Sequence, residues 1–287
     1  MKKKQLKDKP DFTEKDLPKT RRAQFFQIIK DNYSLLVIIG LILLAFLIPL
    51  LVAIFIKYSF IASTNANTGL DEETRIHTIY LIQLIFNAIY VPCFMLFFVA
   101  FGGVLKVFRR LIWNEPLFAV QDFFRGIKEN ILSYLFIGFL VGSIYFLIMF
   151  VYHSLSVQLI YISFIIAGIS LAIVIPILLT ACYLNSIYMT NIFTNIAVAG
   201  RLFIRRGIFI LLILLPLYGL YFLSLIPVYI IIYILILAML FIFLLPLIFL
   251  ASYLNSIKNM DDYINKVQYP EQAYLGLYHP DKDNEDK

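Results

Sequence analysis

The predicted fold depends on the stretch 123–187. It opens with Phe-Phe-Arg-Gly-Ile-Lys-Glu-Asn at 123–130 and closes with Ala-Cys-Tyr-Leu-Asn-Ser-Ile at 181–187. No Asp, Glu, Lys or Arg occurs between Asn130 and Gly200. A single helix of that length, at about 1.5 Å per residue, would be far longer than the roughly 30 Å hydrocarbon thickness of a bilayer. The stretch must therefore fold back on itself, and we predict a surface helix followed by a hairpin of two transmembrane helices.

Both ends of this stretch recur elsewhere in the chain. The opening recurs upstream as Phe-Phe-Gln-Ile-Ile-Lys-Asp-Asn at 25–32. The ending recurs downstream as Ala-Ser-Tyr-Leu-Asn-Ser-Ile at 251–257, and in both copies a proline (Pro176 or Pro246) stands five positions before the alanine. Paired phenylalanines suit the acyl boundary of a membrane, the lysine suits headgroups, and the asparagine suits a change of backbone direction. The repeats predict three versions of one unit, a surface helix plus a transmembrane hairpin.

Composition assigns the chain to the membrane proteins. Hydrophobic residues make up 61% of the 287 residues and charged residues 15%, with a mean hydropathy of +0.86. A soluble domain is typically about 45–50% apolar and about 25% charged. The net charge of +6 comes from basic residues that flank apolar segments, which argues against nucleic-acid binding. Cys93 and Cys182 lie within apolar segments, so we predict buried free thiols rather than a disulfide scaffold.

The predicted fold class is an all-α polytopic membrane protein with six transmembrane helices as three hairpins, each preceded by a cytoplasmic amphipathic surface helix. The spans are 33–56, 79–101, 131–152, 159–184, 207–222 and 228–254, joined within hairpins by a polar loop at 57–75 and turns at 153–156 and 224–227. Gly102-Gly103 is expected to end the second span, and the apolar spacing at 104–112 predicts a surface helix. Asn114 is expected to cap the next helix, with Pro116 in its first turn.

The domain boundaries and the orientation follow from charge. We predict a basic disordered tail at 1–22, a six-helix membrane domain at 23–257 with hairpin units at about 25–101, 118–187 and 190–257, and a polar tail at 258–287. The side of the membrane that holds both tails carries 22 of the 24 Lys and Arg residues. The positive-inside rule therefore predicts a multi-pass protein with both termini in the cytoplasm. The abundance of Ile, Lys, Asn, Phe and Tyr suggests an AT-rich bacterial genome, so the expected location is a bacterial cytoplasmic membrane.

Two groups of residues are candidates for function. Basic and aromatic residues of the surface segments are candidates for contact with a partner or with lipid, namely Phe25, Phe26, Lys30, Arg109, Arg110, Trp113, Phe123, Phe124 and Lys128. The expected partners are the lipid bilayer, anionic lipid headgroups and transporter subunits. Polar residues of the spans are candidates for an intramembrane lining, namely Gln83, Asn87, Asn185 and Asn255. These residues also suit interhelical hydrogen bonds, and the repeated motifs also suit plain membrane anchoring, so both interpretations stay open.

Motifs of known catalytic chemistry are missing from the sequence. The six predicted spans contain no Asp, Glu, Lys or Arg, which weighs against proton- or sodium-coupled transport and against intramembrane aspartyl proteolysis. No Walker A, H-E-x-x-H or G-x-S-x-G motif occurs. His77, His153 and His279 have no carboxylate or cysteine at ligand spacing. We therefore expect no enzymatic activity, no cofactor and no metal site.

The region 25–200 resembles the YesL-like family of bacterial membrane proteins of unknown function. The resemblance rests on Gly102-Gly103 followed by a basic helix, on Trp-Asn-Glu-Pro at 113–116, and on Asp-Phe-Phe at 122–124 with Lys128 and Asn130. This chain has Asn-Glu-Pro where a Gly-Glu pair is common in the family, and its third hairpin makes it longer than typical members. The resemblance implies an accessory role beside carbohydrate ABC importers and carries over no catalytic residue.

Two functional hypotheses follow. The leading one is a non-enzymatic accessory or assembly factor for another membrane complex, such as a carbohydrate ABC importer, with the cytoplasmic surface helices as its contact face. The alternative is a transporter or lipid-handling membrane protein. In that case the proline-bearing helices (Pro49, Pro92, Pro176, Pro216 and Pro246) open a central path that the four polar residues line.

Overall fold

The computed structural model describes residues 17–154, 160–188, 190–223 and 239–278, and these residues contain helices and no strand. The elements are α1 (Arg21–Ala66), α2 (Glu72–Ile112), α3 (Ala119–Ser154), α4 (Ile160–Ile169), η3 (Ser170–Val174), α5 (Ile175–Ile187), α6 (Ile192–Leu223), η4 (Leu240–Leu244), α8 (Leu245–Met260), η5 (Asp261–Asn265), α9 (Lys266–Gln268) and η6 (Pro270–Gln272). Among the described residues, five helical stretches are long and apolar enough to cross a membrane, namely Arg21–Ala66, Glu72–Ile112, Ala119–Ser154, Tyr161–Ile187 and Ile242–Gln268. The prediction of an all-α chain with several membrane-spanning helices is confirmed at this level. The predicted turn at 224–227 and the first part of the sixth span lie outside the described residues.

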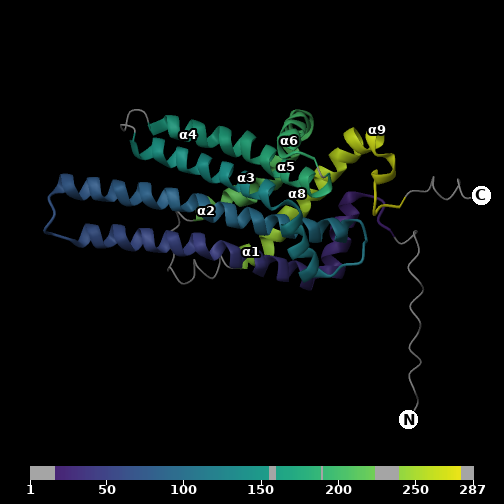
Figure 1. Cartoon of the computed structure of the whole chain (residues 1–287), viewed down its shortest axis with the longest axis horizontal. Helices are drawn as coiled ribbons and strands as arrows, with labels where there is room; N and C mark the ends of the chain where they lie inside the picture. Colours follow the sequence, from purple (N-terminus) through teal and green to yellow (C-terminus); the bar gives the residue numbers. More distant parts are fainter. Residues whose placement is uncertain (1–16, 155–159, 189, 224–238, 279–287) are drawn as a thin grey trace, which may run out of the picture.

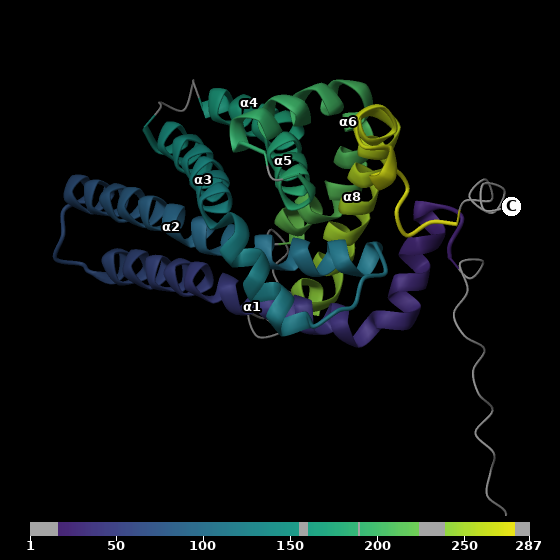
Figure 2. The ribbon, with the colours of Figure 1, turned by 45° about the vertical axis from the view of Figure 1, so that its right-hand side comes forward.

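The helices form an elongated bundle. In Figure 1, α1 and α2 lie side by side as a long hairpin, α3 packs along α2, and α4 runs back beside α3. α8 contacts both α1 and α6, and Figure 2 shows it crossing the bundle near the end where the described parts of both termini lie. That end also carries most of the described basic side chains, and we call it the basic end. The opposite end is formed by the tip of the α1–α2 hairpin.

Three of the long helices change direction at a single residue. The backbone leaves the helical conformation at Asn32 (φ −128°, ψ 29°), at Asn130 (φ −139°, ψ 28°) and at Arg206 (φ −145°, ψ 21°). Asn32 and Asn130 are the asparagines at which the sequence repeat predicts a change of direction. Arg206 has nearly the same dihedral angles without the motif, so the third unit reproduces the bend with a different residue.

The two copies of the closing motif also share a backbone irregularity. A π-helical turn, η3 or η4, comes directly before the residues that contain Pro176 or Pro246. Ile175 and Leu245 donate their N–H groups to the carbonyls of Ser170 and Leu240, five residues back, at matching positions. A proline inside a helix clashes with the carbonyl four residues before it, and the wider π turn relieves this crowding. The two closing segments therefore have the same local structure as well as a similar sequence.

The predicted polar loop at 57–75 is mostly helical. α1 continues to Ala66 and α2 begins at Glu72, so the connection is far shorter than predicted. Asp71 caps α2 by accepting a hydrogen bond from the Thr74 N–H at 3.1 Å, and the contacts with Thr74 hold the pKa of the Asp71 carboxyl below its ordinary value. Polar residues remained helical here because α1 and α2 pair along their whole length, as the 6.1 Å contact between the Phe60 and Phe86 rings illustrates.

The glycine pair 102–103 does not end α2, which corrects the prediction. An added Cβ at Gly102 would lie 2.3 Å from the ring of Tyr134, and one at Gly103 would lie 2.6 Å from the ring of Phe123. The two glycines therefore admit aromatic rings of α3 against the backbone of α2. Residues 104–108 are buried, so this part of the predicted surface helix belongs to the protein core.

The polar side of that segment and the following turn also differ from the prediction. Lys106 is buried and donates to Glu129 at 2.7 Å, so its charge is neutralised within the protein. Asn114 adopts a left-handed conformation (φ 53°) after the end of α2 instead of capping α3. Pro116 lies before the first turn of α3, and Asp122 supplies the cap by accepting from the Phe118 N–H at 2.9 Å.

Glycine also sets the distance between α2 and α3 within the membrane-spanning part. A Cβ at Gly138 would lie 2.6 Å from the Cα of Met95, and one at Gly142 would lie 2.8 Å from the Cα of Val91. The spacing of these glycines is the small-xxx-small pattern that lets two helices approach closely where lipid provides no hydrophobic driving force. This contact holds the first hairpin to the second.

Replacing Gly138 with Ala is therefore expected to destabilise the bundle by about 1–3 kcal/mol, because the added methyl group overlaps the backbone of α2. The measurement is the thermal melting temperature of the purified protein in mild detergent. Gly168→Ala is the matched control, because an added Cβ at Gly168 meets no described atom within 4 Å. Equal melting temperatures for the two variants would contradict close packing at Gly138.

Candidate functional site

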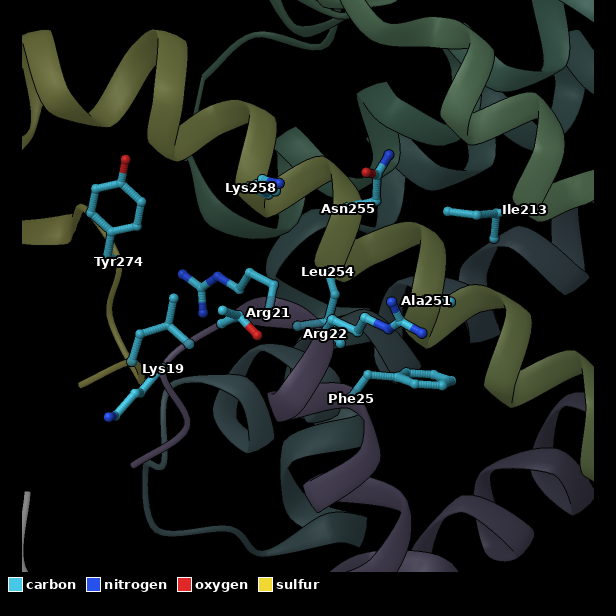
Figure 3. A pocket seen from close by; sticks show the side chains of 12 residues that line it. Lys19, Arg21, Arg22, Phe25, Ile213, Ala251, Leu254, Asn255, Lys258 and Tyr274 are labelled. Atoms are coloured by element: carbon cyan, nitrogen blue, oxygen red, sulfur yellow. The ribbon is translucent and has the colours of Figure 1, made fainter. Parts of the chain in front are cut away.

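A cavity of about 510 Å³ lies between the start of α1 and α8 at the basic end. Figure 3 shows side chains of α1 facing side chains of α8, with Tyr274 of the C-terminal segment on one side and Ile213 of α6 on the other. Its basic lining residues are Lys19, Arg21, Arg22 and Lys258, and its apolar lining residues are Phe25, Ile213, Ala251, Leu254 and Leu277. Thr20, Asn255 and Tyr274 add hydroxyl and amide groups. The cavity therefore combines basic and apolar side chains in one lining, and Figure 3 shows Arg22 beside Phe25 and Ala251.

The charge of the cavity is largely uncompensated. Among the described residues that line it, none carries a carboxylate. Lys19, Arg22 and Lys258 are exposed, whereas Arg21 is paired in the interior with Asp261. The first turn of α1 contains no acidic residue, although the partial positive charge of a helix N-terminus favours anions there. The exposed cations and the N-terminus of α1 therefore both make the electrostatic potential in the cavity positive.

The apolar lining extends along α6 beyond its bend. Ile213 lies about 10 Å beyond the bend at Arg206, measured along the axis of α6. Phe25 lies in the surface part of α1, before the bend at Asn32. The lining therefore runs from the basic end of the protein along the apolar part of α6.

Asn255 offers an unused hydrogen-bond donor at the cavity. Its Nδ2 atom is buried and has no acceptor among the described residues. Asn185, at the same position of the other closing motif, lies in the interior and accepts a 3.2 Å hydrogen bond from Asn195 at its Oδ1, while its Nδ2 also has no acceptor among the described residues. The repeated asparagine thus has an internal partner in the second unit and lines a cavity in the third.

A buried ion pair fixes the position of the first turn of α1. Arg21 and Asp261 pair at 2.7 Å, and their side chains are 6% and 1% exposed. The second oxygen of Asp261 accepts from Asn265 at 2.8 Å and from the backbone N–H of Tyr274 at 3.2 Å. The second terminal nitrogen of Arg21 donates to the carbonyl of Leu275 at 2.8 Å. The pair is therefore surrounded by further hydrogen bonds, as a charge removed from water requires.

The C-terminal segment 269–278, which we call the strap, closes one side of the cavity. Gln24 donates to the carbonyls of Ile112 at 2.6 Å and Gly276 at 3.2 Å, and the Tyr278 N–H donates to the carbonyl of Pro18 at 3.1 Å. Gly276 has φ +78°, and a Cβ there would lie 2.0 Å from the Ile112 carbonyl oxygen. Only glycine allows the strap to approach α2 this closely.

The sequence predicts a polar tail from residue 258 onward, and the structure differs over most of it. α8 continues to Met260, and η5 buries both Asp261 and Asn265. The Tyr188 hydroxyl donates to Asn265, and burial raises the pKa of the Tyr188 phenol above its ordinary value. Residues 258–278 are thus part of the folded domain, while residues 279–287 and 1–16 of the predicted tails lie outside the described residues.

The two closing motifs contact each other next to this site. Tyr183 bonds to Ser252, and Tyr253 bonds to Ser186 at 2.7 Å. Arg109 donates to the Ser186 carbonyl at 2.9 Å. The repeated tyrosines and serines therefore join α5 to α8, which favours the interpretation of these motifs as helix-joining elements.

The predicted contact residues fall into two groups in the structure. Phe26, Lys30, Phe124 and Lys128 are exposed on the surface parts of α1 and α3. Phe123 is 4% exposed and packs against α2 in the core, so it is not available to a partner.

The remaining contact candidates serve the interior or the cavity. Phe25 is half-buried and lines the cavity. The Arg109 guanidinium lies 5.1 Å from the centre of the Trp113 ring. Arg110 pairs with Asp122 at 3.1 Å. Arg109, Arg110 and Trp113 therefore lie in contacts at and around the turn between α2 and α3.

The structure does not bring the four predicted lining residues together. Gln83 lines an open depression near the hairpin tip, and Asn87 accepts a 3.2 Å hydrogen bond from Lys57 between α1 and α2. Asn185 and Asn255 lie near the opposite, basic end. The four residues serve separate local contacts instead of one continuous path.

The sequence pattern does not predict that Lys57 and Arg21 are buried. Lys57 falls in the predicted polar loop, yet its side chain is 8% exposed and lies 5.6 Å from the centre of the Tyr90 ring. Seven apolar residues, 50–56, precede it without a helix-breaking residue, which is the local signal that could have placed it in the helix. The partner of Arg21 could not be found locally, because 240 residues separate the two positions. Among the described residues, no group of three or more His, Cys, Asp or Glu side chains could hold a metal ion.

Asp261→Asn is expected to destabilise the protein by about 3–5 kcal/mol, because it leaves the Arg21 guanidinium buried without its counterion. Thermal melting in mild detergent measures the loss, and limited proteolysis measures release of the strap. Glu72→Gln is the control, because its ion pair with Arg75 is exposed and about 0–1 kcal/mol is expected from it. Similar melting temperatures for both variants would contradict a structural role for the buried pair.

The chain shows no significant match to known proteins in three comparisons. No protein-family model matches its sequence. The curated proteins and the solved structures provide no match either. The resemblance to the YesL-like family therefore stays a prediction, and the site is interpreted from its own geometry.

Proposed function

We propose that this protein is a non-enzymatic, multi-pass membrane protein that binds lipid at the cytoplasmic face of a bacterial membrane. The observation that carries the proposal is the cavity between α1 and α8, whose lining combines basic side chains with apolar ones. A lipid likewise combines a polar headgroup with apolar chains. Lipid handling is therefore the function to which this geometry is best suited.

The proposed topology has six spans with both termini in the cytoplasm. The membrane-spanning parts of α1, α3 and α6 each begin after a bend, which suits a surface helix that turns into the bilayer. The basic end carries Lys106, Arg109 and Arg206 as well as the cations of the cavity, so the positive-inside rule assigns it to the cytoplasm. In this orientation the cavity lies at the level of the inner-leaflet headgroups.

A lipid site of this kind needs no catalytic group. The basic residues attract a headgroup, and the apolar wall formed by Phe25, Ile213 and Leu254 accepts part of a chain. Because the buried pair of Arg21 and Asp261 holds the lining in place without a ligand, the site is preorganised and little ordering free energy is lost on binding.

Ala251→Trp is expected to fill the cavity and to reduce bound lipid several-fold, because the indole occupies the volume next to Leu254 and Arg22. The measurement is mass-spectrometric quantification of lipid that copurifies in mild detergent. Ala88→Trp is the matched control, since Ala88 lies on the exposed face of α2. Undiminished lipid in a folded Ala251→Trp protein would rule out the cavity as a lipid site.

A second function, an accessory role beside another membrane complex, is favoured by the length of the first hairpin. The part of α1 beyond Asn32 is about 51 Å long and the part of α3 beyond Asn130 about 36 Å. The α1–α2 tip extends past the other helices (Figure 1). Tyr58, Phe60 and Ile76 are exposed near that tip, where a bilayer of ordinary thickness no longer covers them. This surface suits a partner protein on the outer side.

If the accessory role holds, changing Tyr58, Phe60 and Ile76 together to Ser will abolish copurification of a membrane partner. The purification uses native membranes and gentle detergent, with mass spectrometry of what is retained. Phe124→Ser serves as the control, because Phe124 is equally exposed but lies at the basic end. Retention of the same partner at the same stoichiometry by the triple variant would count against the tip as a contact surface.

A further inference from the structure

We propose that the cavity selects an anionic phospholipid, with the lipid phosphate held by Arg22, Lys258 and Asn255. This inference rests on the proposed lipid-binding function and adds the headgroup chemistry to it. The observation that carries it is that a cationic N-terminus of α1, an exposed lysine of α8 and an unsatisfied amide donor of α8 line the same partly apolar cavity.

The first step concerns charge. Lys19, Arg22 and Lys258 line the cavity, and no described lining residue carries a carboxylate that could neutralise them. Arg21 also lines it, but its charge is matched by Asp261. Three cations beside a helix N-terminus repel one another unless an anion lies between them. A ligand with a net negative charge is therefore favoured at this place.

The second step concerns hydrogen bonds. Among the lining residues, Asn255 has a buried Nδ2 with no acceptor in the described part of the chain, as Asn185 also has outside the cavity. A buried donor without an acceptor costs about 1–3 kcal/mol, so Asn255 favours a ligand that brings oxygen acceptors. A phosphate group supplies several acceptor oxygens around one atom and also carries the required charge. Charge and hydrogen bonding thus indicate the same chemical group.

The third step separates a phospholipid from free phosphate. Phe25 from the surface part of α1, Ile213 from α6, and Ala251 and Leu254 from α8 form the apolar part of the lining. Free phosphate would leave this surface unoccupied, whereas an acyl chain would bury it. The phosphate is therefore expected to enter as part of a membrane lipid.

The fourth step concerns the rest of the headgroup. A zwitterionic lipid such as phosphatidylcholine carries an ammonium group, which would lie among Lys19, Arg22 and Lys258 without a carboxylate partner in the described lining. The ammonium group and these three cations carry like charges and repel one another. Phosphatidylglycerol keeps the phosphate and replaces the cation with hydroxyl groups. The cavity is therefore expected to prefer phosphatidylglycerol to phosphatidylcholine.

The test measures the affinity of the full chain in mild detergent for short-chain phosphatidylglycerol and phosphatidylcholine that carry the same fluorophore. We expect the wild-type protein to prefer phosphatidylglycerol about 30-fold, at roughly one basic-residue contribution each from Arg22 and Lys258. Arg22→Gln/Lys258→Gln is expected to bring the two affinities close together. Asn255→Leu is expected to weaken phosphatidylglycerol binding about tenfold, at nearly unchanged side-chain size.

The matched control is Lys30→Gln/Lys128→Gln, which removes two exposed cations of the surface helices that do not line the cavity. This control is expected to keep the wild-type preference, and an equal loss in it would overturn the assignment to the cavity in favour of general surface charge. Competition with inorganic phosphate separates the two sources of the anion. Displacement by phosphate alone, without dependence on the acyl chain, would overturn the lipid assignment.

The two proposals fail in distinguishable ways. If Ala251→Trp removes both lipids but the wild-type protein does not discriminate between them, the cavity binds lipid and the phosphate assignment is wrong. If Ala251→Trp leaves both affinities unchanged in a folded protein, the lipid site itself is wrong. Melting temperatures of all variants identify any loss of binding that comes from unfolding.

Discussion

The buried pair of Arg21 and Asp261 is the interaction on which the basic end depends. Two charges withdrawn from water are tolerated only where further hydrogen bonds satisfy their remaining atoms, and here α1, η5 and the strap supply those bonds together. The pair neutralises the charge of Arg21. The neighbouring Lys19 and Arg22 have no carboxylate partner among the described residues that line the cavity. The ion-paired Arg21 therefore stabilises the wall of the cavity, and Lys19 and Arg22 make the electrostatic potential in the cavity positive.

The site contains an asparagine of the repeated closing motif, and the surroundings of this asparagine differ between the two copies. The second and third units share a π turn, a proline and a Tyr-Leu-Asn-Ser sequence, so they present an asparagine at the same place on the same backbone. Asn185 finds Asn195 within its own unit. Around Asn255, the start of α1 and the strap line a cavity and supply no hydrogen-bond acceptor for the Asn255 Nδ2. A repeat that supports the architecture in one copy thus provides a binding group in another.

Hydropathy and charge runs were enough to predict the helices, because an apolar stretch without charges has few alternatives in a bilayer. The bends at Asn32 and Asn130 were also predictable, since a short motif marks both. The bend at Arg206 was not, and the glycine pair 102–103 was taken for a helix end because the rings that fill its place come from α3. The helical extension through Lys57 depends on pairing between two helices, which a linear pattern of polarity does not encode. The YesL-like resemblance and the accessory role stay predictions.

The cavity could not be predicted from local sequence. Its walls also come from parts of the chain that are synthesised at different times. Its rim joins the start of α1 to residues 240 and more positions later in the chain. At a synthesis rate of about 5–20 residues per second, α1 waits roughly 10–50 seconds before its counterion leaves the ribosome. Throughout that interval Arg21 lacks its counterion. A truncated or stalled chain that ends before residue 261 therefore keeps an arginine without its ion pair at the start of α1.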